Sequence, residues 1–224
     1  MKMFPAETDF IDIHSHSLAN EEGVFRLHNV FSADFPHIPI DLPLSIGLHP
    51  WHLNADAINE LPGILRNAVE LPNIFALGET GLDSVSKTPI DEQLPVFRKH
   101  IEFGIEYKKP LIIHCVKAFQ ELLGLRREYP ESAVWIVHGF NSNETIAAGC
   151  VKAGIYVSLS QRLLRNPEKA AKITSVVPLS SVFIETDDDP MSIQAVYEAV
   201  SGFYGVELKE LKRNIFDNYF RVFR

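Results

Sequence analysis

The amino-acid sequence predicts an α/β protein in which parallel strands close into a barrel surrounded by helices. Short apolar runs, typical of buried strands, alternate with amphipathic helical segments along most of the chain. Polar residues follow nearly every one of these runs in turn, whereas an open sheet gathers its functional residues at a single crevice. We therefore predict a TIM-type (β/α) barrel that occupies residues 1–224 as a single domain.

The first third of the chain departs from a regular barrel. Phe10–Ile13 supplies an opening strand, Val24–Phe31 fits a short strand or half of a hairpin, and Leu44–Leu48 is a third apolar run. No good helical pattern separates the first two runs, and 224 residues lie near the lower end for eight β/α units, which typically need about 250. We expect a distorted barrel in which Gly23–Pro43 replaces a full unit.

Helices and strands alternate regularly from residue 55 onward. Apolar residues at helical spacing predict the helices, and short apolar runs predict the strands between them. Pro62 is expected to interrupt the first of these helices, and the strand that begins at Ile74 is expected to end at Gly78-Glu79. The predicted helices are Ala55–Glu70, Ile90–Tyr107, Phe119–Tyr129, Ser142–Ala153, Asn166–Val176, Ser192–Tyr204 and Leu208–Phe220, and the predicted strands are Ile74–Leu77, Leu111–Ile113, Val134–Val137, Ile155–Leu159 and Val182–Ile184.

Composition and charge argue against several classes of protein. An apolar content of 46% with 22% charged residues is typical of a soluble globular chain. No apolar run approaches the ~20 residues of a membrane span, and two cysteines are too few for a disulfide framework. We expect a cytoplasmic protein with no membrane association and no obligate protein partner. The net charge of -8 gives no support for binding nucleic acid through a basic surface, although divalent cations can supply local positive charge.

Imidazoles and carboxylates that commonly bind metal ions stand at the predicted strand ends. His14 and His16 are two residues apart, so an extended chain points both rings the same way. A lone His in such a place is more often structural, and Asp187 alone fits a helix cap. A barrel, however, brings all the strand ends together on one face, so these side chains would be buried next to one another. Buried charged groups are stable only when they are paired or bind a metal ion. The gathered residues are His14, His16, His49, Glu79, His114, His138, Glu185 and Asp187.

The ligand types predict two divalent cations. Imidazole combined with carboxylate suits Zn, Mn, Fe or Mg. Four histidines and two carboxylates exceed the three protein ligands of a single catalytic zinc, so two adjacent cations are the natural number. One cation is assigned to His14, His16, Glu79 and Asp187 and the other to Glu79, His114 and His138, with the Glu79 carboxylate as the bridge.

Six short motifs contain or flank these residues, and they are DIHSHS at 12–17, GLHPW at 47–51, ALGETGLD at 76–83, LIIHC at 111–115, VHGF at 137–140 and ETDDDP at 185–190. In this order they resemble the motifs of the TatD-like metal-dependent hydrolases of the amidohydrolase superfamily. The resemblance implies a distorted β/α barrel and, for most members, metal-dependent deoxyribonuclease activity. It also implies that His49 and Glu185 matter for activity, and that the metal ligands are His14, His16, Glu79, His114, His138 and Asp187.

The residues around the ligands depart from the family pattern. Ser17 and Leu18 follow His16, where the family has Leu and then Asp. Val116 stands in place of an Arg, and Gly139 in place of a Cys. An extra acidic pair, Asp188-Asp189, follows the last ligand. Because the ligands are retained while their surroundings change, these departures bear on the substrate rather than on the metal.

The predicted activity is hydrolysis of a phosphodiester, in DNA or a small substrate, by a water activated between the cations. Asp187 would orient that water and accept its proton, and Glu185 would fix a ligating imidazole or a bound water. His49 has two open roles, donation to a phosphate oxygen or packing under Trp51. The alternatives are hydrolysis of a small lactone or amide, and metal binding without catalysis.

Overall fold

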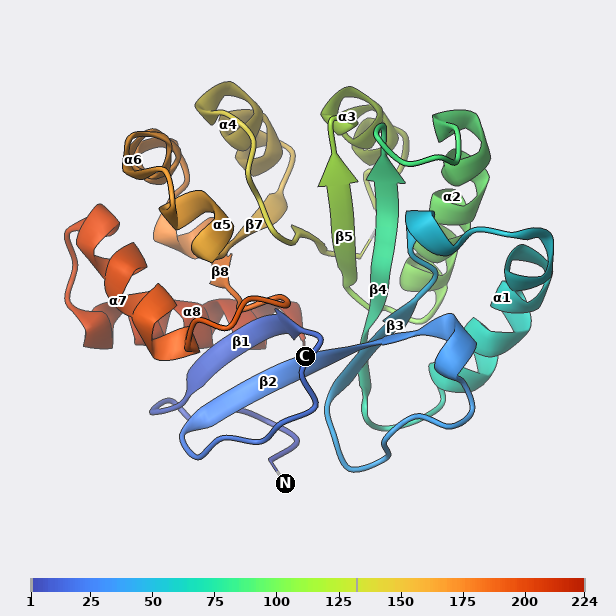
Figure 1. Ribbon diagram of the computed structural model, residues 1–224, viewed down its shortest axis with the longest axis horizontal. Coiled ribbons are helices and arrows are strands. Elements are labelled where there is room, and N and C mark those ends of the chain that lie inside the picture. Colours follow the sequence, from blue (N-terminus) through green and yellow to red (C-terminus); the bar gives the residue numbers. More distant parts are fainter. Residues whose placement is uncertain (1, 132, 224) are drawn as a thin grey trace.

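The computed structural model describes residues 2–131 and 133–223, in which eight parallel strands form one sheet in chain order (Figure 1). The two edge strands meet through a parallel bridge between Ser15 and Asp187. The Asp187 N–H donates to the His14 carbonyl at 3.0 Å, and the His16 N–H donates to the Asp187 carbonyl at 3.2 Å. The sheet therefore closes on itself, and the predicted TIM-type barrel is confirmed.

The strands are short and mostly buried, and their positions follow the predicted apolar runs. The largest difference is in the strand that begins at Ile74, which continues through Glu79 to Asp83, beyond its expected end, and the strand that begins at Leu111 also continues past Ile113 to Val116. All ten residues from Ile74 to Asp83 are buried, so Glu79 is a polar side chain within a buried strand rather than a terminator. The strands are β1 Phe10–Ser15, β2 Val24–Phe31, β3 Leu44–Gly47, β4 Ile74–Asp83, β5 Leu111–Val116, β6 Trp135–Val137, β7 Ile155–Leu159 and β8 Val182–Ile184.

Helices cover most of the barrel, and within the described residues none of them is long and apolar enough to cross a bilayer. The expected interruption at Pro62 was wrong, because Leu61 and Leu65 pack into the core on either side of it and offset the lost hydrogen bond. The short α5 was not predicted. The helices are α1 Ala55–Ala68, α2 Ile90–Glu106, α3 Phe119–Glu128, α4 Glu144–Lys152, α5 Gln161–Leu164, α6 Pro167–Val176, α7 Ile193–Tyr204 and α8 Leu208–Val222, with 3-10 turns η1 Ser32–Asp34, η2 Pro50–His52 and η3 Leu179–Ser181.

The first third is trimmed, as the sequence predicts. β2 runs parallel to β1, with Phe10 opposite Val24, which settles the open choice against a hairpin. Residues 23–43 contain β2 and the 3-10 turn η1 but no α-helix. Figure 1 accordingly shows the blue strands at the lower edge of the barrel without the outer helices that flank β4 and β5.

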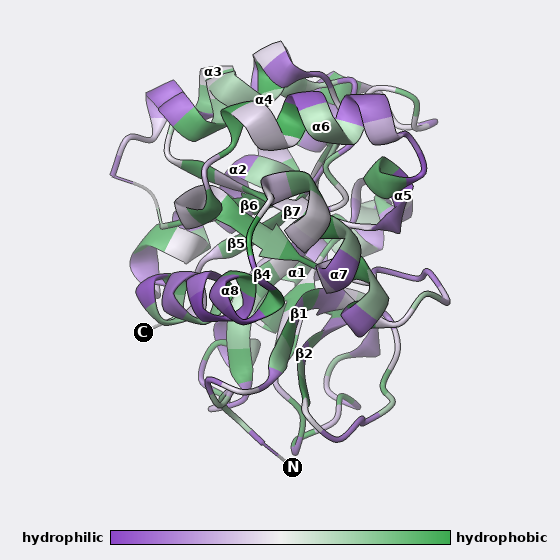
Figure 2. Ribbon diagram, turned by 90° about the vertical axis from the view of Figure 1, so that its left-hand side faces the viewer, coloured by the Kyte–Doolittle hydropathy of each residue, from purple (hydrophilic) through white to green (hydrophobic). Residues whose placement is uncertain are grey.

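The two C-terminal helices pack against the first strands and bury them. The Tyr197 hydroxyl of α7 donates to the Ile11 carbonyl at 3.0 Å and accepts from the Ile11 N–H at 3.1 Å. Tyr219 of α8 meets Phe25 of β2 edge to face, with ring centroids 5.0 Å apart. Figure 2 shows the same division, with hydrophobic strands inside and hydrophilic residues along the outer side of α8. The C-terminal helices α7 and α8 therefore cover the strands β1 and β2, which have no α-helix between them in the sequence.

Candidate metal centre

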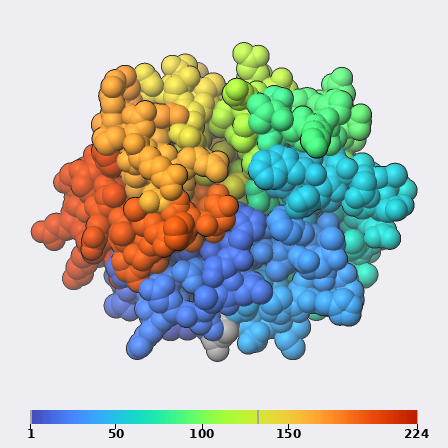
Figure 3. All heavy atoms as spheres, in the orientation of Figure 1, coloured from blue at the N-terminus to red at the C-terminus, as the bar shows by residue number. Residues whose placement is uncertain are grey.

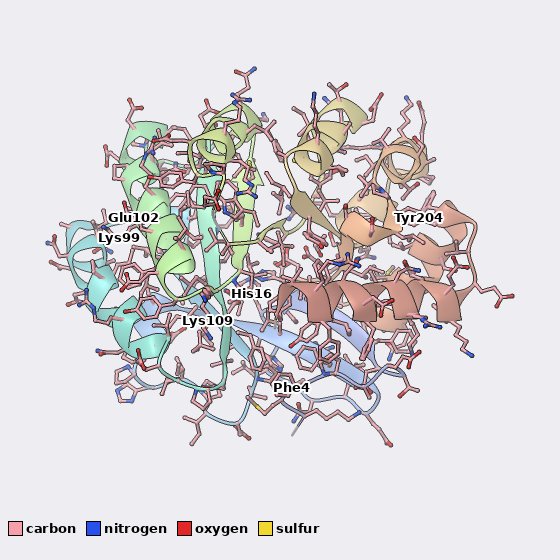
Figure 4. The ribbon with its side chains drawn as sticks, turned by 180° about the vertical axis from the view of Figure 1, so that it is seen from behind. Phe4, His16, Lys99, Glu102, Lys109 and Tyr204 are labelled. Carbon is pink, nitrogen blue, oxygen red and sulfur yellow. The ribbon has the colours of Figure 1, made fainter. Side chains whose placement is uncertain are left out.

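The strands deliver the predicted ligands to one mouth of the barrel. His14, Glu79 and His114 belong to β1, β4 and β5, and His138 directly follows β6. The strand register shifts between Asp12 and Ser15 and again between Leu77 and Thr80, so His14 and Glu79 lie where the ladder is irregular. Such irregularities re-aim side chains. Figure 4 places His16 near the middle of the molecule, whereas Lys99 and Glu102 lie on the outer helix α2.

Glu79 lies at the centre of this cluster, and its two carboxylate oxygens face different imidazoles. Its Oε2 lies 3.7 Å from His14 Nε2 and 3.5 Å from His16 Nε2. Its Oε1 lies 2.9 Å from His114 Nδ1 and 2.7 Å from His138 Nε2. Burial opposes the ionisation of Glu79, but the charge of His138 and the hydrogen bonds from the imidazoles hold its pKa well below the ordinary value. The carboxylate is therefore ionised at neutral pH.

Asp187 completes the half of the cluster that contains His14 and His16. Its Oδ1 lies 3.6 Å from His14 Nε2 and 3.5 Å from His16 Nε2. Asp187 has a φ of 58°, in the left-handed region that few residues other than Gly and Asn adopt. Its backbone is held there by the bridge to Ser15 at the closure of the barrel. The structure thus brings together the residues assigned to the first cation.

The chemistry of His14 tests whether these residues suit a metal ion. The His14 side chain is fully buried, and neither ring nitrogen makes a hydrogen bond within the described part of the chain. Burial lowers the pKa of His14 well below its ordinary value, so the ring is neutral. A neutral imidazole is the form that ligates a metal, and coordination satisfies a buried nitrogen that nothing else pairs. His14, His16 and Glu79 offer ligand atoms within 4.8 Å of one another, and so do His14, His138 and Asp187.

Asp83 orients His114, and the sequence prediction missed it. The His114 Nε2 lies 3.2 Å from Asp83 Oδ2, on the side of the ring away from Glu79. If His114 donated from Nε2 to Asp83, its Nδ1 lone pair would be free to ligate a cation held beside Glu79, which is the arrangement that carboxylate partners of ligating histidines typically produce. Asp83 stands four residues after Glu79 in one strand and so shares its face. That alternation would have identified Asp83 if the strand had been extended past Glu79.

His49 is a hydrogen-bonded residue beside Glu79 rather than a free ligand. The Trp51 N–H donates to His49 Nδ1 at 3.1 Å, which places the ring proton on Nε2. That Nε2 lies 3.1 Å from Glu79 Oε1. His49, Glu79 and His114 are also close enough to share an ion, but a protonated Nε2 cannot ligate one. Of the two predicted roles, the geometry favours packing under Trp51, with donation to Glu79 in place of a phosphate.

Glu185 lies behind His138, on the side away from Glu79. Its Oε1 is 3.6 Å from His138 Nδ1, which is an electrostatic contact rather than a hydrogen bond. The Gly139 N–H donates to the same oxygen, and Glu185 is fully buried. Burial alone would lower the pKa of His138, but the charges of Glu79 and Glu185 raise it well above the ordinary value. Glu185 therefore orients an imidazole from outside the cluster and does not reach the pocket.

The cluster opens into a pocket of about 510 Å³. One wall carries exposed apolar groups, Trp51 and Val85, and the opposite side carries Arg162 from α5. Arg162 is the one Lys or Arg side chain among the residues that line this pocket. Figure 3 shows the cyan segment around residue 50 and the orange segment around residue 165 on either side of a hollow. The pocket is large enough for a small ligand and has little positive charge of its own.

Comparisons with known proteins show the family of this chain. The family model described as TatD related DNase matches residues 37–224. The chain belongs to the TatD-related DNase family. It is 31% identical over 196 residues to an Escherichia coli K12 protein named as an uncharacterized metal-dependent hydrolase, YcfH, covering 80% of this chain and 72% of that one. A Bacillus subtilis protein of the same description, YabD, is 28% identical over 199 residues, covering 80% and 76%.

The fold comparison extends over almost the whole barrel. The crystal structure of YJJV, a TatD homolog from Escherichia coli K12, superposes with a TM-score of 0.83. The match covers 97% of this chain and 99% of the other at 20% identity, so it bears on the fold alone. The predicted resemblance is confirmed, and family membership makes the chain a metal-dependent hydrolase.

Proposed function

We propose that this TatD-family protein hydrolyses phosphodiester bonds, at the ends of DNA or in small phosphodiesters, with two divalent cations. The observation that carries the proposal is the arrangement around Glu79, whose Oε2 faces His14 and His16 and whose Oε1 faces His114 and His138. A carboxylate whose two oxygens face different imidazoles is suited to bridging two ions. The nitrogens of His14 are fully buried and have no hydrogen-bond partner among residues 2–131 and 133–223, which supports metal ligation over a structural role.

We assign the residues to the two ions in the same way as the sequence-based prediction does. His14, His16 and Asp187 would hold one ion with Glu79 Oε2, and His114 and His138 would hold the other with Glu79 Oε1. When bound, the cations supply two kinds of chemistry, because they lower the pKa of water and neutralise charge on the substrate. The remaining chemistry belongs to the side chains of the chain itself.

Asp187 is the proposed proton acceptor. Burial, together with the charge of Glu185, raises the pKa of Asp187 from 3.8 to about 6. The carboxylate is therefore still ionised at neutral pH and able to accept a proton. Its side chain is 16% exposed and lines the pocket, while its Oδ1 remains close to His14 and His16. These properties suit an acceptor for the proton of the attacking water.

The remaining polar groups orient the ligands. Asp83 accepts from His114, Glu185 faces His138, and His49 donates to Glu79. Glu185 does not line the pocket, whereas His49 and Asp83 do, and each of the three contacts fixes the direction of a proposed ligand. Partners of this kind typically change metal affinity or activity by about 10-fold to 100-fold when they are removed.

The pocket lining favours a short substrate over a long nucleic acid. Arg162 is the one cationic side chain among the lining residues, and Val116 lies where the family pattern has an Arg. A chain of many phosphates needs several cationic side chains along its path, and a single lining Arg does not supply them. A single phosphodiester group, by contrast, is neutralised by two bound cations and one Arg.

A second candidate is hydrolysis of a small lactone or amide. The same scarcity of cationic lining groups favours it, because a neutral substrate needs no phosphate-binding residue. One assay separates the two candidates. Single-stranded DNA, bis(p-nitrophenyl) phosphate and a panel of lactones and amides are supplied to the protein with Zn, Mn or Mg, and again after chelation. Cation-dependent phosphodiester cleavage supports the proposal, whereas cleavage of lactones or amides alone supports the second candidate, and no turnover of any substrate contradicts both.

A further inference from the structure

We propose that Trp51 is a stacking platform for an aromatic base on the substrate, so that the site selects phosphoesters that carry a nucleobase. The inference rests on the proposed phosphodiesterase function and narrows its substrate class. Trp51 is 62% exposed and lines the pocket that contains Glu79, His114 and His138. The exposed indole is therefore available to a ligand beside the polar reaction centre.

The indole is fixed in place rather than free to rotate into solvent. Its Nε1–H donates to Asp83 Oδ2 at 2.6 Å, and the Trp51 backbone N–H donates to His49 Nδ1. Asp83 is itself fully buried and saturated, because its Oδ1 accepts from the Val85 N–H at 2.8 Å and its backbone pairs with Gln93. A rigid aromatic group loses little conformational entropy when a ligand stacks on it.

The rings around Trp51 leave indole surface open toward the pocket. His49 and His114 meet it edge to face, with ring centroids 4.8 Å and 5.6 Å away and interplanar angles of 80° and 72°. Neither imidazole therefore stacks parallel to the indole. Because His114 is a proposed ligand and also shares Asp83 with Trp51, a group stacked on the indole lies beside the metal centre. Val85, which is 61% exposed, extends the apolar wall on the same side.

A planar base fits this wall better than the other parts of a nucleotide. Stacking on an aromatic side chain contributes ~1–3 kcal/mol per base and accepts any base, which converts to about 5-fold to 150-fold in affinity. The sugar and the phosphate are polar and gain little from Trp51 and Val85. The wall therefore accounts for recognition of a nucleotide unit in a pocket with a single lining Arg.

Tryptophan fluorescence tests the proposal without turnover, because the chain has two Trp residues and only one of them is exposed. Trp135 is fully buried, so quenching by a ligand reports on Trp51. The fluorescence of the Mg-loaded protein is followed during titration with deoxyadenosine monophosphate. Calorimetry then measures the affinity for this nucleotide and for deoxyribose phosphate, which lacks the base. We expect quenching by the nucleotide and a 5-fold to 150-fold tighter binding of the nucleotide than of the sugar phosphate.

Three variants sharpen the test. Trp51→Leu abolishes the preference for the base and leaves the weaker binding of the sugar phosphate in place. Trp51→Phe keeps a ring but loses the bond to Asp83, so it retains part of the preference. Phe4→Leu makes a similar change at an aromatic residue that is 57% exposed outside the pocket, and it leaves both affinities unchanged.

The outcomes separate this inference from the proposed function. Equal affinity of the wild type for the two ligands overturns the inference, as does binding of neither ligand or a base preference that survives in Trp51→Leu. Phosphodiester hydrolysis without a base preference leaves the proposed function intact and removes the inference. A base preference without phosphodiester hydrolysis leaves Trp51 as a base-binding residue and contradicts the proposed reaction.

Discussion

The Asp12 carboxylate accepts two hydrogen bonds from Thr186, one from its N–H at 2.9 Å and one from its hydroxyl at 2.7 Å. Asp12 belongs to β1, and Thr186 follows β8, so this pair ties the two edges of the sheet together. Arg26 of β2 donates from Nε to the same carboxylate at 2.9 Å. Asp187 is the next residue after Thr186, so the pair also fixes the backbone from which the proposed proton acceptor projects.

Replacement of Thr186 with Val therefore affects both stability and metal binding. The change removes the hydroxyl donor and leaves a fully buried carboxylate less satisfied, which costs about 1–3 kcal/mol in the free energy of unfolding. Urea denaturation measures that loss, and metal titration should show weaker binding because Asp187 is less firmly held. Thr174→Val is the matched control, since the Thr174 hydroxyl bonds only to carbonyls of its own helix. Unchanged stability and metal affinity in Thr186→Val would contradict the assigned role.

Asp187→Asn should abolish hydrolysis while it preserves the fold. Asn tolerates the left-handed backbone at this position, so the change removes the base with little strain. Loss of general-base assistance alone lowers the rate by about 10²–10⁴-fold, and any loss of metal adds to that. Phosphodiester cleavage and the melting temperature are measured together. The control is Asp188→Asn, an exposed neighbour, and retained activity in Asp187→Asn would remove this residue from proton transfer.

The Gly81 position should not accept a side chain. A Cβ there would lie 2.0 Å from the His114 carbonyl oxygen, and the φ of 140° is one that L-residues rarely adopt. We expect Gly81→Ala to destabilise the protein by more than 3 kcal/mol, the cost of severe backbone strain, or to prevent folding. Gly63→Ala is the control, because nothing lies within 4 Å and Ala stabilises an exposed helix by roughly 0.5–1 kcal/mol. Thermal unfolding measures both, and a neutral Gly81→Ala would refute the close contact of β4 with β5.

His100 should give the protein an acid-sensitive stability. The ring is fully buried in α2 and accepts a hydrogen bond from the Leu48 N–H at 3.1 Å, and burial lowers its pKa from 6.5 to about 4. Between pH 6.5 and 4 the unfolded chain therefore binds a proton that the folded chain does not. In this window the free energy of unfolding falls by about 1.4 kcal/mol per unit as the pH decreases, and above pH 6.5 this contribution is constant. Urea midpoints across the range measure it, and an identical slope in His100→Gln would contradict the assignment.

The sequence predicted the barrel and the set of candidate ligands because both depend on local patterns. Apolar runs define the strands, and a parallel barrel brings their ends to one face, so His14, Glu79 and His138 could be grouped without coordinates. The residues that close the barrel could not be predicted, because Asp12 and Thr186 are 174 positions apart and no local sequence pattern indicates that they are in contact. Asp83 was missed because Glu79 was interpreted as the end of a strand that continues in a buried, irregular form.

The role of His49 also required the structure. Whether its Nε2 faces a substrate or a carboxylate depends on the turn η2, in which the backbone of Trp51 fixes the other nitrogen. The exposed indole of Trp51 could not be distinguished from a core residue in the sequence. The residue type shows how apolar a side chain is, but the packing of neighbouring segments decides whether that side chain is buried.

Equilibrium binding of Zn or Mn to the wild type and to Glu79→Gln tests the central claim most directly. Elemental analysis after dialysis against the metal counts the ions, and the melting temperature confirms that each chain is folded. The arrangement around Glu79 predicts about two equivalents for the wild type and loss of the paired site in Glu79→Gln, whose amide cannot bridge two cations. A wild-type protein that binds no metal, or a Glu79→Gln variant that binds two ions as tightly as the wild type, would contradict it.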